Sequence, residues 1–494
     1  MTQPWAELLY TAAEMQAAEA TYPGPMLELM ERAGAAVANC VLSRYPSAKR
    51  VSVWCGGGSN GGDGLVVARL LHEAGCEVEI LLLADEGRLK GDAAENLRRA
   101  RELGLRFVGV AGRADIVVDA LFGTGFTGAP RREAVQAIAM INDSSEAVVS
   151  VDVPSGVDAS TGEVVGAAVE AAVTVTFHGC KVGLAVAPGR FHAGEVEVVD
   201  IGLAHDETLH RRVGAEILEL VPRRGPRDNK YSAGSVLVVG GSTGLTGAPS
   251  LAAEAALRAG AGIVFLCVPA SLYPVFGQRL LEVMARPCAD DGEGSFTPAA
   301  AEAILELAAR ADAVAVGPGL GRSEGARELV RLLLERLELP VVIDADGLSS
   351  LAGHLDWVFS RDAPTVLTPH AGELGRLLGK ESARVSARRL NSVRAGAADT
   401  GATVLLKGAD TLVAAPGHGV LVSDLGNPGL ATAGSGDVLT GIVAAFLAKG
   451  MLPQLAAAAA ATAQGRAASL AAERGGWAGM IASDVIGALS AALS

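Results

Sequence analysis

The sequence predicts an α/β protein of two domains, each built around a largely parallel β-sheet. Its 494 residues are too many for one ordinary hydrophobic core, and this length predicts two or three domains. Half of the residues are apolar and only 4% are aromatic, while glycine occurs 62 times. That composition is typical of buried parallel strands of Ala, Val, Leu and Ile joined by tight turns.

Both halves of the chain open with the same pattern, in which an apolar strand runs into a Gly-rich loop and then an Ala/Leu-rich helix. In the first half these are residues 51–55, 56–64 and 65–75; in the second half they are residues 235–239, 240–249 and 250–260. Strand and helix segments of this size predict βαβ units.

Further apolar segments predict the remaining strands, and the segments at 402–408 and 411–416 are expected to form an antiparallel hairpin. The apolar periodicity breaks near 205–230, so we expect domains at 1–212 and 231–494 with a linker at 213–230. The other predicted strands are 77–83, 115–122, 147–153, 173–177, 262–269, 312–317, 341–346 and 365–369.

Charge and cysteine usage exclude several classes of function. The net charge of −14 argues against a nucleic-acid partner, and the basic residues between Arg223 and Lys230 are typical of a solvated linker. The N-terminus has no signal-peptide pattern, and the longest apolar stretch, 438–448, is too short to span a bilayer, so we expect a cytoplasmic protein. The six scattered cysteines are expected to be reduced core thiols, and no zinc motif is present.

The segment 427–437 (NPGLATAGSGD) is the strongest functional signal in the C-terminal half. Gly434, Ser435 and Gly436 can turn their N–H groups into a concave nest at the start of a helix, which suits a phosphate or a transferring phosphoryl group. Asp437 in that setting is a candidate general base for an attacking hydroxyl. The alternative for an isolated G-x-G-D is a helix cap.

Three other segments support this site. Lys407 ends an apolar strand beside Gly408 and is a candidate phosphate ligand, or otherwise a lysine at a hairpin turn. Glu373 in 368–374 follows a strand and opens a helix, where a capping acid is the alternative, and 316–321 is another Gly-rich turn after a strand.

In the N-terminal half, 56–61 (GGGSNG) matches G-x-G-x-x-G between a strand and a helix, a pattern of dinucleotide-binding domains. Asn60 and Asp63 make the segment polar, and a loop of this length is longer than a Rossmann turn requires. Asp119 and Asp152 each end an apolar strand before a Gly-rich turn, which suits cation binding or proton transfer; the alternative for each is a turn-forming Asp.

The C-terminal motifs resemble the NAD(P)H-hydrate dehydratases of the ribokinase-like fold, over most of 222–494. The resemblance implies that Asp437 is the base at the hydroxyl of hydrated NADH or NADPH, that magnesium takes part and that ADP is the phosphoryl donor. It places substrate at Ala248, Gly319, His370 and Asp437. It places nucleotide at Lys407, Gly408, Ala409, Asp410, Thr411, Asn427, Pro428, Gly429, Leu430, Ala431, Thr432, Ala433, Gly434, Ser435 and Gly436. Gln464 stands where the family often has His.

The N-terminal motifs resemble the Rossmann-like NAD(P)H-hydrate epimerase domain, over about 8–210. The resemblance implies a potassium ion at Asn60, Asp119 and Ser155, and makes Asp119 and Asp152 candidates for proton transfer, with Lys181 as a candidate or a surface lysine. Implied substrate contacts are Ser59, Asn60, Gly61, Gly62, Asp63, Gly123, Thr124, Gly125, Phe126, Thr127, Gly128, Ala129 and Asp152.

Together the two resemblances predict a bifunctional repair enzyme for hydrated NAD(P)H, self-associating like its relatives. Two alternatives stay open at this point. One is a ribokinase-type small-molecule kinase fused to a nucleotide-sensing domain, and the other is a binding protein that senses nicotinamide nucleotides without turnover. The residues themselves do not distinguish ADP from ATP.

Overall fold

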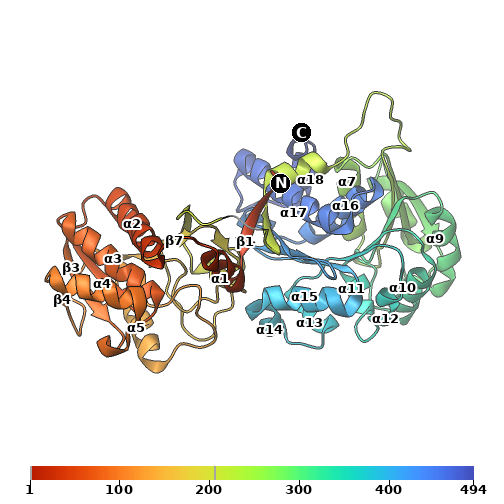
Figure 1. The fold of residues 1–494 in the computed structure, drawn as a ribbon. Helices are drawn as coiled ribbons and strands as arrows, with labels where there is room; N and C mark the ends of the chain where they lie inside the picture. Colours follow the sequence, from red (N-terminus) through yellow and green to blue (C-terminus); the bar gives the residue numbers. More distant parts are fainter. Residues whose placement is uncertain (1–2, 205–206) are drawn as a thin grey trace. The chain divides into compact units, whose positions relative to one another are not determined.

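The structure is a computed structural model that describes residues 3–204 and 207–494. The chain divides into an N-terminal unit, Leu8–His210, and a C-terminal unit, which comprises Arg211–Ser494 and the segment that ends at Glu7. Both units consist of helices around a β-sheet, which confirms the predicted α/β class (Figure 1). No helix among the described residues is long and apolar enough to cross a membrane.

The N-terminal unit is built on a parallel sheet with the strand order β4-β3-β2-β5-β6-β7-β9. The central strand β5 is buried at every position, as expected for a sheet covered on both faces. A separate short ladder joins Leu9 and Tyr10 to Cys180 and Lys181. The strands are β1 (Ala6–Tyr10), β2 (Arg50–Cys55), β3 (Glu77–Leu82), β4 (Arg106–Phe107), β5 (Ile116–Ala120), β6 (Ala147–Val151), β7 (Val173–Phe177), β8 (Cys180–Lys181) and β9 (Glu195–Val199).

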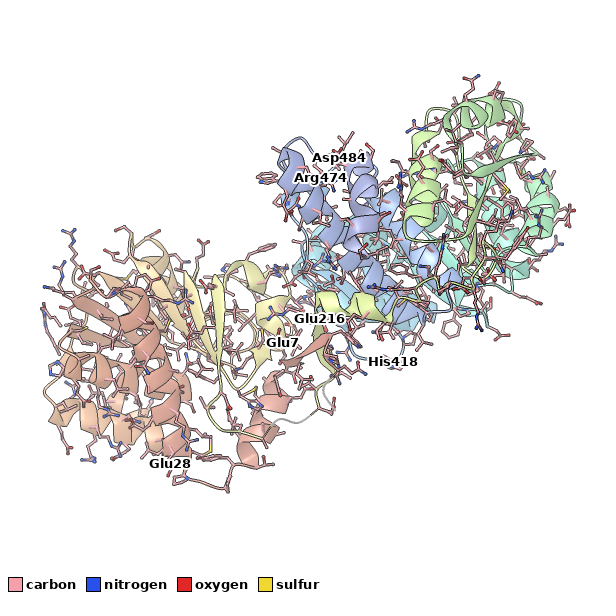
Figure 2. All side chains as sticks on the ribbon, turned by 90° about the horizontal axis from the view of Figure 1, so that it is seen from above. Glu7, Glu28, Glu216, His418, Arg474 and Asp484 are labelled. Carbon is pink, nitrogen blue, oxygen red and sulfur yellow. The ribbon has the colours of Figure 1, made fainter. Side chains whose placement is uncertain are left out.

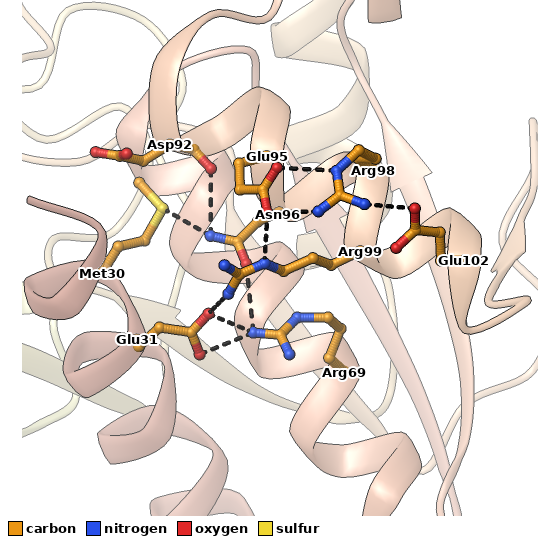
Figure 3. A network of polar contacts seen from close by, with 9 residues as sticks. All are labelled: Met30, Glu31, Arg69, Asp92, Glu95, Asn96, Arg98, Arg99 and Glu102. Atoms are coloured by element: carbon orange, nitrogen blue, oxygen red, sulfur yellow. Dashed lines mark hydrogen bonds and ion pairs between the residues drawn. The ribbon is translucent and has the colours of Figure 1, made fainter.

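A polar network joins three helices of this unit, α2 (Met26–Arg44), α3 (Ser59–Glu73) and α4 (Gly91–Glu102) (Figure 3). The Glu31 carboxylate on α2 accepts hydrogen bonds from Arg69 on α3 at 2.6 Å and from Arg99 on α4 at 2.8 Å. One carboxylate of α2 therefore holds both α3 and α4. The other helices are α1 (Ala12–Ala20), α5 (Arg132–Asn142), α6 (Val182–Ala185), η1 (Glu86–Arg88) and η2 (Gly189–Phe191).

The Gly-rich segment 56–64 is not the long loop that the sequence predicts, because helix α3 already begins at Ser59. Its glycines allow close packing. A Cβ on Gly61 would lie 1.9 Å from the Gly56 carbonyl oxygen, and one on Gly64 would lie 2.5 Å from the Ala120 Cβ. Glycine is needed because the helix approaches the strand ends more closely than any side chain allows.

The C-terminal unit has a mixed sheet with the order β13-β12-β11-β14-β15-β16-β17-β18-β19-β10. Its strands are parallel from β13 to β17, and β17, β18 and β19 are antiparallel neighbours, which confirms the predicted hairpin. The strands are β10 (His210–Val213), β11 (Ser235–Val239), β12 (Ile263–Pro269), β13 (Met284–Cys288), β14 (Ala313–Val316), β15 (Val341–Ile343), β16 (Thr365–Leu367), β17 (Thr403–Leu406), β18 (Thr411–Ala414) and β19 (Leu421–Ser423).

Figure 1 shows α7, α16, α17 and α18 over one face of this sheet and α10, α11, α13 and α15 over the other. The Ala-rich helix α17 lies in the core, with Ala456–Ala460 fully buried. The helices are α7 (Gly247–Arg258), α8 (Tyr273–Arg279), α9 (Ala301–Ala308), α10 (Glu324–Arg336), α11 (Asp346–Ser350), α12 (Asp356–Phe359), α13 (Ala371–Leu377), α14 (Ser382–Ala387), α15 (Arg389–Thr400), α16 (Ser435–Ala448), α17 (Pro453–Gly475), α18 (Ala482–Ala492), η3 (Ala215–Leu220), η4 (Ala270–Leu272), η5 (Pro298–Ala300) and η6 (Pro428–Leu430).

The segment expected as a linker, 213–230, begins with ordered structure. Its helix η3 buries the apolar side chains of Ile217 and Leu218 in the core of the C-terminal unit. All six cysteines are free and buried, as the composition predicts.

Candidate active sites

The N-terminal unit has a cavity of about 480 Å³ where the carboxyl ends of β2, β5 and β6 meet. Parallel strands bring residues far apart in sequence to one edge, which is where open α/β sheets bind ligands. Of the residues that the sequence analysis singles out, the cavity lining contains Ser59, Asn60, Asp63, Gly123, Thr124, Gly125, Phe126, Asp152 and Lys181. The predicted contacts Gly61, Gly62, Thr127, Gly128 and Ala129 are not among the lining residues.

Asp152 and Lys181 form a buried ion pair in this cavity. The Lys181 ammonium lies 2.8 Å from Asp152 Oδ1 and also donates to Thr176 Oγ1 and the Phe177 carbonyl. Burial alone favours the neutral acid, but Lys181 and the hydrogen bonds from Thr124 outweigh it and lower the pKa of Asp152. The interpretation of Lys181 as a surface lysine is wrong, since its side chain is 0% exposed.

Asp119 is placed differently from Asp152. It is fully buried, it does not line the cavity, and its carboxylate accepts four hydrogen bonds. Ser155 donates through both its hydroxyl (2.6 Å) and its backbone N–H (2.9 Å), while the Ser150 hydroxyl and the Leu121 N–H supply the others. Burial still raises the pKa of Asp119, because none of these donors carries a charge. This arrangement suits a structural or cation-holding carboxylate better than a proton carrier.

Two further acids face the cavity. The pKa of Asp63 is raised well above its usual value by burial and by the nearby charges of Asp152 and Glu19. Sequence reasoning missed Glu19, which lies on α1 and also lines the cavity. No motif surrounds it, so only the fold brings it to the site.

In the C-terminal unit, Gly434 is the N-cap of α16 with φ +89°, a conformation that favours glycine. Asp437 therefore lies in the first helical turn, where the N–H groups of an α-helix have no intrahelical partners. Burial and the charge of Asp344 raise the pKa of Asp437 to about 7, despite the opposing effect of Lys407. Such a pKa suits a general base near neutral pH.

A buried network lies beneath Asp437. The Lys407 ammonium lies 2.9 Å from Asp344 and 3.7 Å from Glu373, and the Thr440 hydroxyl on α16 donates to Asp344 at 2.7 Å. A Cβ on Gly436 would lie 3.2 Å from the Lys407 nitrogen, so the lysine lies against the Gly-rich turn. The sequence analysis missed Asp344, although it ends an apolar strand, the same signal that identifies Asp119 and Asp152.

The predicted substrate residues of this unit lie at neighbouring strand ends. A Cβ on Gly319 would approach the Ala248 Cβ to 3.3 Å, so these two residues are adjacent. His370 is the N-cap of α13, and its Nδ1 accepts a hydrogen bond from the Gly372 N–H at 2.9 Å. Glu373 completes this cap by accepting from the His370 N–H, so its predicted capping role is confirmed while it also faces Lys407.

Asp410 and Asn427 in the predicted nucleotide segments, and Gln464 beside them, make internal contacts. The Asp410 carboxylate is 1% exposed and pairs with Arg389 at 3.0 Å. Gln464 on α17 donates to the Ser435 carbonyl at 2.5 Å, so the residue that departs from the family pattern contacts the Gly-rich turn directly. Asn427 accepts from the Gly429 N–H, while its buried amide nitrogen has no hydrogen-bond partner within the described part of the chain.

Comparison with known proteins agrees with the motifs of both units. A family model described as NAD(P)H-hydrate dehydratase matches residues 236–490, and one described as YjeF-related protein N-terminus matches residues 26–183. A bifunctional NAD(P)H-hydrate repair enzyme of Moorella thermoacetica is 41% identical, with 97% of this chain and 95% of the relative aligned. The Escherichia coli enzyme of the same name is 38% identical over 94% of this chain and 89% of its own.

Solved structures match the C-terminal part of the chain. An ADP/ATP-dependent NAD(P)H-hydrate dehydratase from Bacillus subtilis, crystallised with ATP and Mg²⁺, is 25% identical with a TM-score of 0.48, covering 56% of this chain and 94% of that one. The long sequence matches carry the assignment, because they extend through both units. They confirm the resemblance that the motifs predict, and the chain belongs to the family of bifunctional NAD(P)H-hydrate repair enzymes.

Proposed function

We propose that this chain has two active sites, which together convert hydrated NADH and NADPH back to NADH and NADPH. The N-terminal cavity interconverts the R and S epimers of the hydrate, and the C-terminal site dehydrates the S epimer at the expense of a nucleotide. The observation that carries the second step is the position of Asp437, in the first turn of α16 above the network of Lys407 and Asp344.

Dehydration requires activation of the substrate hydroxyl, because hydroxide is a poor leaving group. In the proposed reaction, Asp437 accepts the proton of the substrate hydroxyl as the hydroxyl oxygen attacks the terminal phosphoryl group of the nucleotide. The N–H groups around Gly434–Gly436 stabilise the charge that develops on the transferring group. Phosphate then leaves with the electron pair of the carbon–oxygen bond, and loss of a proton from the neighbouring ring carbon restores NADH or NADPH.

We infer that ADP is the donor, with AMP as its product, and that magnesium accompanies its phosphates. Within residues 3–204 and 207–494, no cluster of three His, Cys, Asp or Glu side chains forms a metal cage. The charges of Asp346 and Glu373 act on Asp437, and Asp346 also pairs with Arg322 at 3.0 Å. These two carboxylates would face a magnesium ion held chiefly by the nucleotide, since magnesium commonly uses one or two carboxylates plus phosphates. The nucleotide is expected along 427–436 and beside Lys407.

We propose that the N-terminal site holds a potassium ion at Asn60, Asp119 and Ser155. The residues fit such an ion, because the buried Asp119 carboxylate meets no Lys or Arg among the described residues, while the Asn60 amide and the Ser155 hydroxyl, both buried, can supply neutral oxygen ligands. A monovalent cation beside Asp119 would offset the cost of burying its charge. It would supply a fixed positive charge near the Gly123–Phe126 turn, while Asp152 and Lys181 face the substrate.

The test is absorbance at 340 nm with the purified chain, magnesium, potassium and a mixture of both hydrate epimers. With ADP we expect complete recovery of the reduced nucleotide. Recovery that stops at the share of the S epimer would contradict the epimerase assignment and leave the dehydratase. Recovery with ATP alone would correct the donor, and no recovery with either nucleotide would refute the proposed function.

A further inference from the structure

Helix α1 brings an acid to the N-terminal cavity that the motifs of the sequence do not identify. Glu19 lines the cavity together with Asp63, Asp152 and Lys181, which come from three other segments of the chain. Glu19 lies near the end of α1, outside the Gly-rich turns of the N-terminal unit. The cavity therefore contains three carboxyl groups and one ammonium group.

The surroundings of Glu19 differ from those of Glu14, the other acid of this helix. Glu14 accepts hydrogen bonds from Thr11 and from the Leu209 N–H, which commits both of its oxygens to the fold. No hydrogen bond or ion pair of the Glu19 side chain is found among the residues that the structure describes, although the residue is half-buried. A carboxyl group that lines a cavity without a partner is available to a ligand.

Asp152 is not available as a proton donor in the way that Glu19 is. Its two oxygens are occupied by Lys181, Thr176 and Thr124, and the positive charge of Lys181 holds it ionised. Epimerisation by exchange of a hydroxyl needs a group that gives a proton as well as one that accepts it. Two carboxyl groups in different environments are a common solution to this requirement.

We propose that Glu19 is a catalytic acid–base residue of the epimerase site, acting on the substrate hydroxyl together with Asp152. The inference deepens the epimerase half of the proposed function and rests on it. The charged groups that face Glu19 are Asp63 from α3, Asp152 after β6 and Lys181 from β8. Burial and Asp152 raise the pKa of Glu19, and Lys181 partly opposes this shift, which agrees with a proton donor.

In the proposed epimerisation, one water leaves the substrate carbon and another adds to its opposite face. The carbon that carries the hydroxyl is bonded to the ring nitrogen. Glu19 gives its proton to the hydroxyl, the carbon–oxygen bond breaks with its electron pair on oxygen, and water leaves as the nitrogen lone pair forms a carbon–nitrogen double bond. Water then adds to the other face, and its proton passes to Asp152. Exchange with solvent returns one proton to Glu19, so the net change is inversion alone.

The decisive variant is Glu19→Gln, which keeps the size of the side chain and cannot donate this proton. With the R epimer, followed by chromatographic separation of the epimers, we expect kcat for epimerisation to fall about 100-fold or more with little change in KM. Glu19→Asp should restore part of the rate. Dehydration of the S epimer by the same chain should be unchanged, which shows that the C-terminal unit is folded. The N-terminal unit should keep its wild-type denaturant midpoint, which shows that the unit carrying Glu19 is folded as well.

Glu28→Gln is the matched control, because it removes the same charge from a surface position on α2 (Figure 2). Among the residues that the structure describes, Glu28 meets only Arg32 at 3.8 Å and the Tyr22 hydroxyl, so we expect full epimerase activity. The pH profile gives an independent readout. The wild-type rate should fall as pH rises through the raised pKa of Glu19, and this limb should be absent in Glu19→Gln.

Full epimerase activity in Glu19→Gln would overturn the inference, and so would a change in KM alone, which would make Glu19 a binding residue. An unchanged pH profile in that variant would overturn it as well. Failure of the wild-type chain to epimerise would instead refute the proposed function, so the two failures are distinguishable.

Discussion

The two candidate sites shift the pKa of a buried Asp in opposite directions. In the N-terminal cavity, Asp152 has a fully buried lysine and several hydrogen-bond donors, so its pKa is lowered. In the C-terminal site, burial and the charge of Asp344 raise the pKa of Asp437 to about 7, because the one positive charge of Lys407 is shared among Asp344, Glu373 and Asp437 and only partly opposes the shift. The difference shows that neighbouring charges decide whether the pKa of a buried Asp lies below its usual value or near neutrality.

The largest effect should come from Asp437→Asn, which removes the proposed base but preserves the shape of the site. We expect nucleotide-dependent dehydration to fall about 10³-fold, measured at 340 nm with the S epimer. Epimerisation by the same protein should continue at the wild-type rate. A variant that retains a tenth of the dehydratase activity would show that Asp437 is only a helix cap.

Next in size is the loss of the buried cation in the N-terminal unit. Lys181→Met leaves Asp152 without its counter-ion, and breaking such a pair from one side costs about 3–5 kcal/mol. We expect a lower denaturant midpoint for the N-terminal unit, read from its own unfolding transition, while that of the C-terminal unit stays in place. The double variant Asp152→Asn/Lys181→Met should recover part of the loss; an equal or larger loss would argue against a specific ion pair.

A smaller effect tests the close packing of α3. In Gly61→Ala the new methyl group would overlap the Gly56 carbonyl, which lies 1.9 Å from the position of its Cβ. Overpacking of this kind costs about 1–3 kcal/mol, so the free energy of unfolding should fall by that amount. Gly58→Ala is the matched control, since no atom lies within 4 Å of its Cβ position. Equal stability of both variants would contradict the packing explanation.

The smallest effect concerns the pH dependence of dehydration. A base must be deprotonated to act, so the rate should rise with pH through the pKa of Asp437, about 7, and then level off. A tenth of the sites would be active about one unit below that pKa. Initial rates of NADH recovery at saturating nucleotide between pH 5.5 and 8.5, about the range of this titration, provide the measurement. A flat profile would show that the neighbouring acids do not raise the pKa.

The sequence alone predicts the α/β class, nearly all of the central strands and the Gly-rich turns of both sites, because buried parallel strands and glycine turns have strong local patterns. It also identifies Asp437, Asp152 and Asn60, which belong to recognisable motifs. The predicted start of α3 is wrong by several residues, because glycines that allow close helix packing have the same sequence pattern as glycines of a loop.

Only the tertiary structure decides which charges meet. Lys181 resembles a surface lysine in the sequence, yet it is fully buried against Asp152, whereas Asp410 in a nucleotide motif turns to Arg389. No motif surrounds Glu19, and the strand end that carries Asp344 does not reveal its partner Lys407, so only the fold shows that each residue belongs to a site. The physical reason is that motifs record local backbone needs, whereas the pKa of a side chain depends on burial and on charges that are distant in sequence.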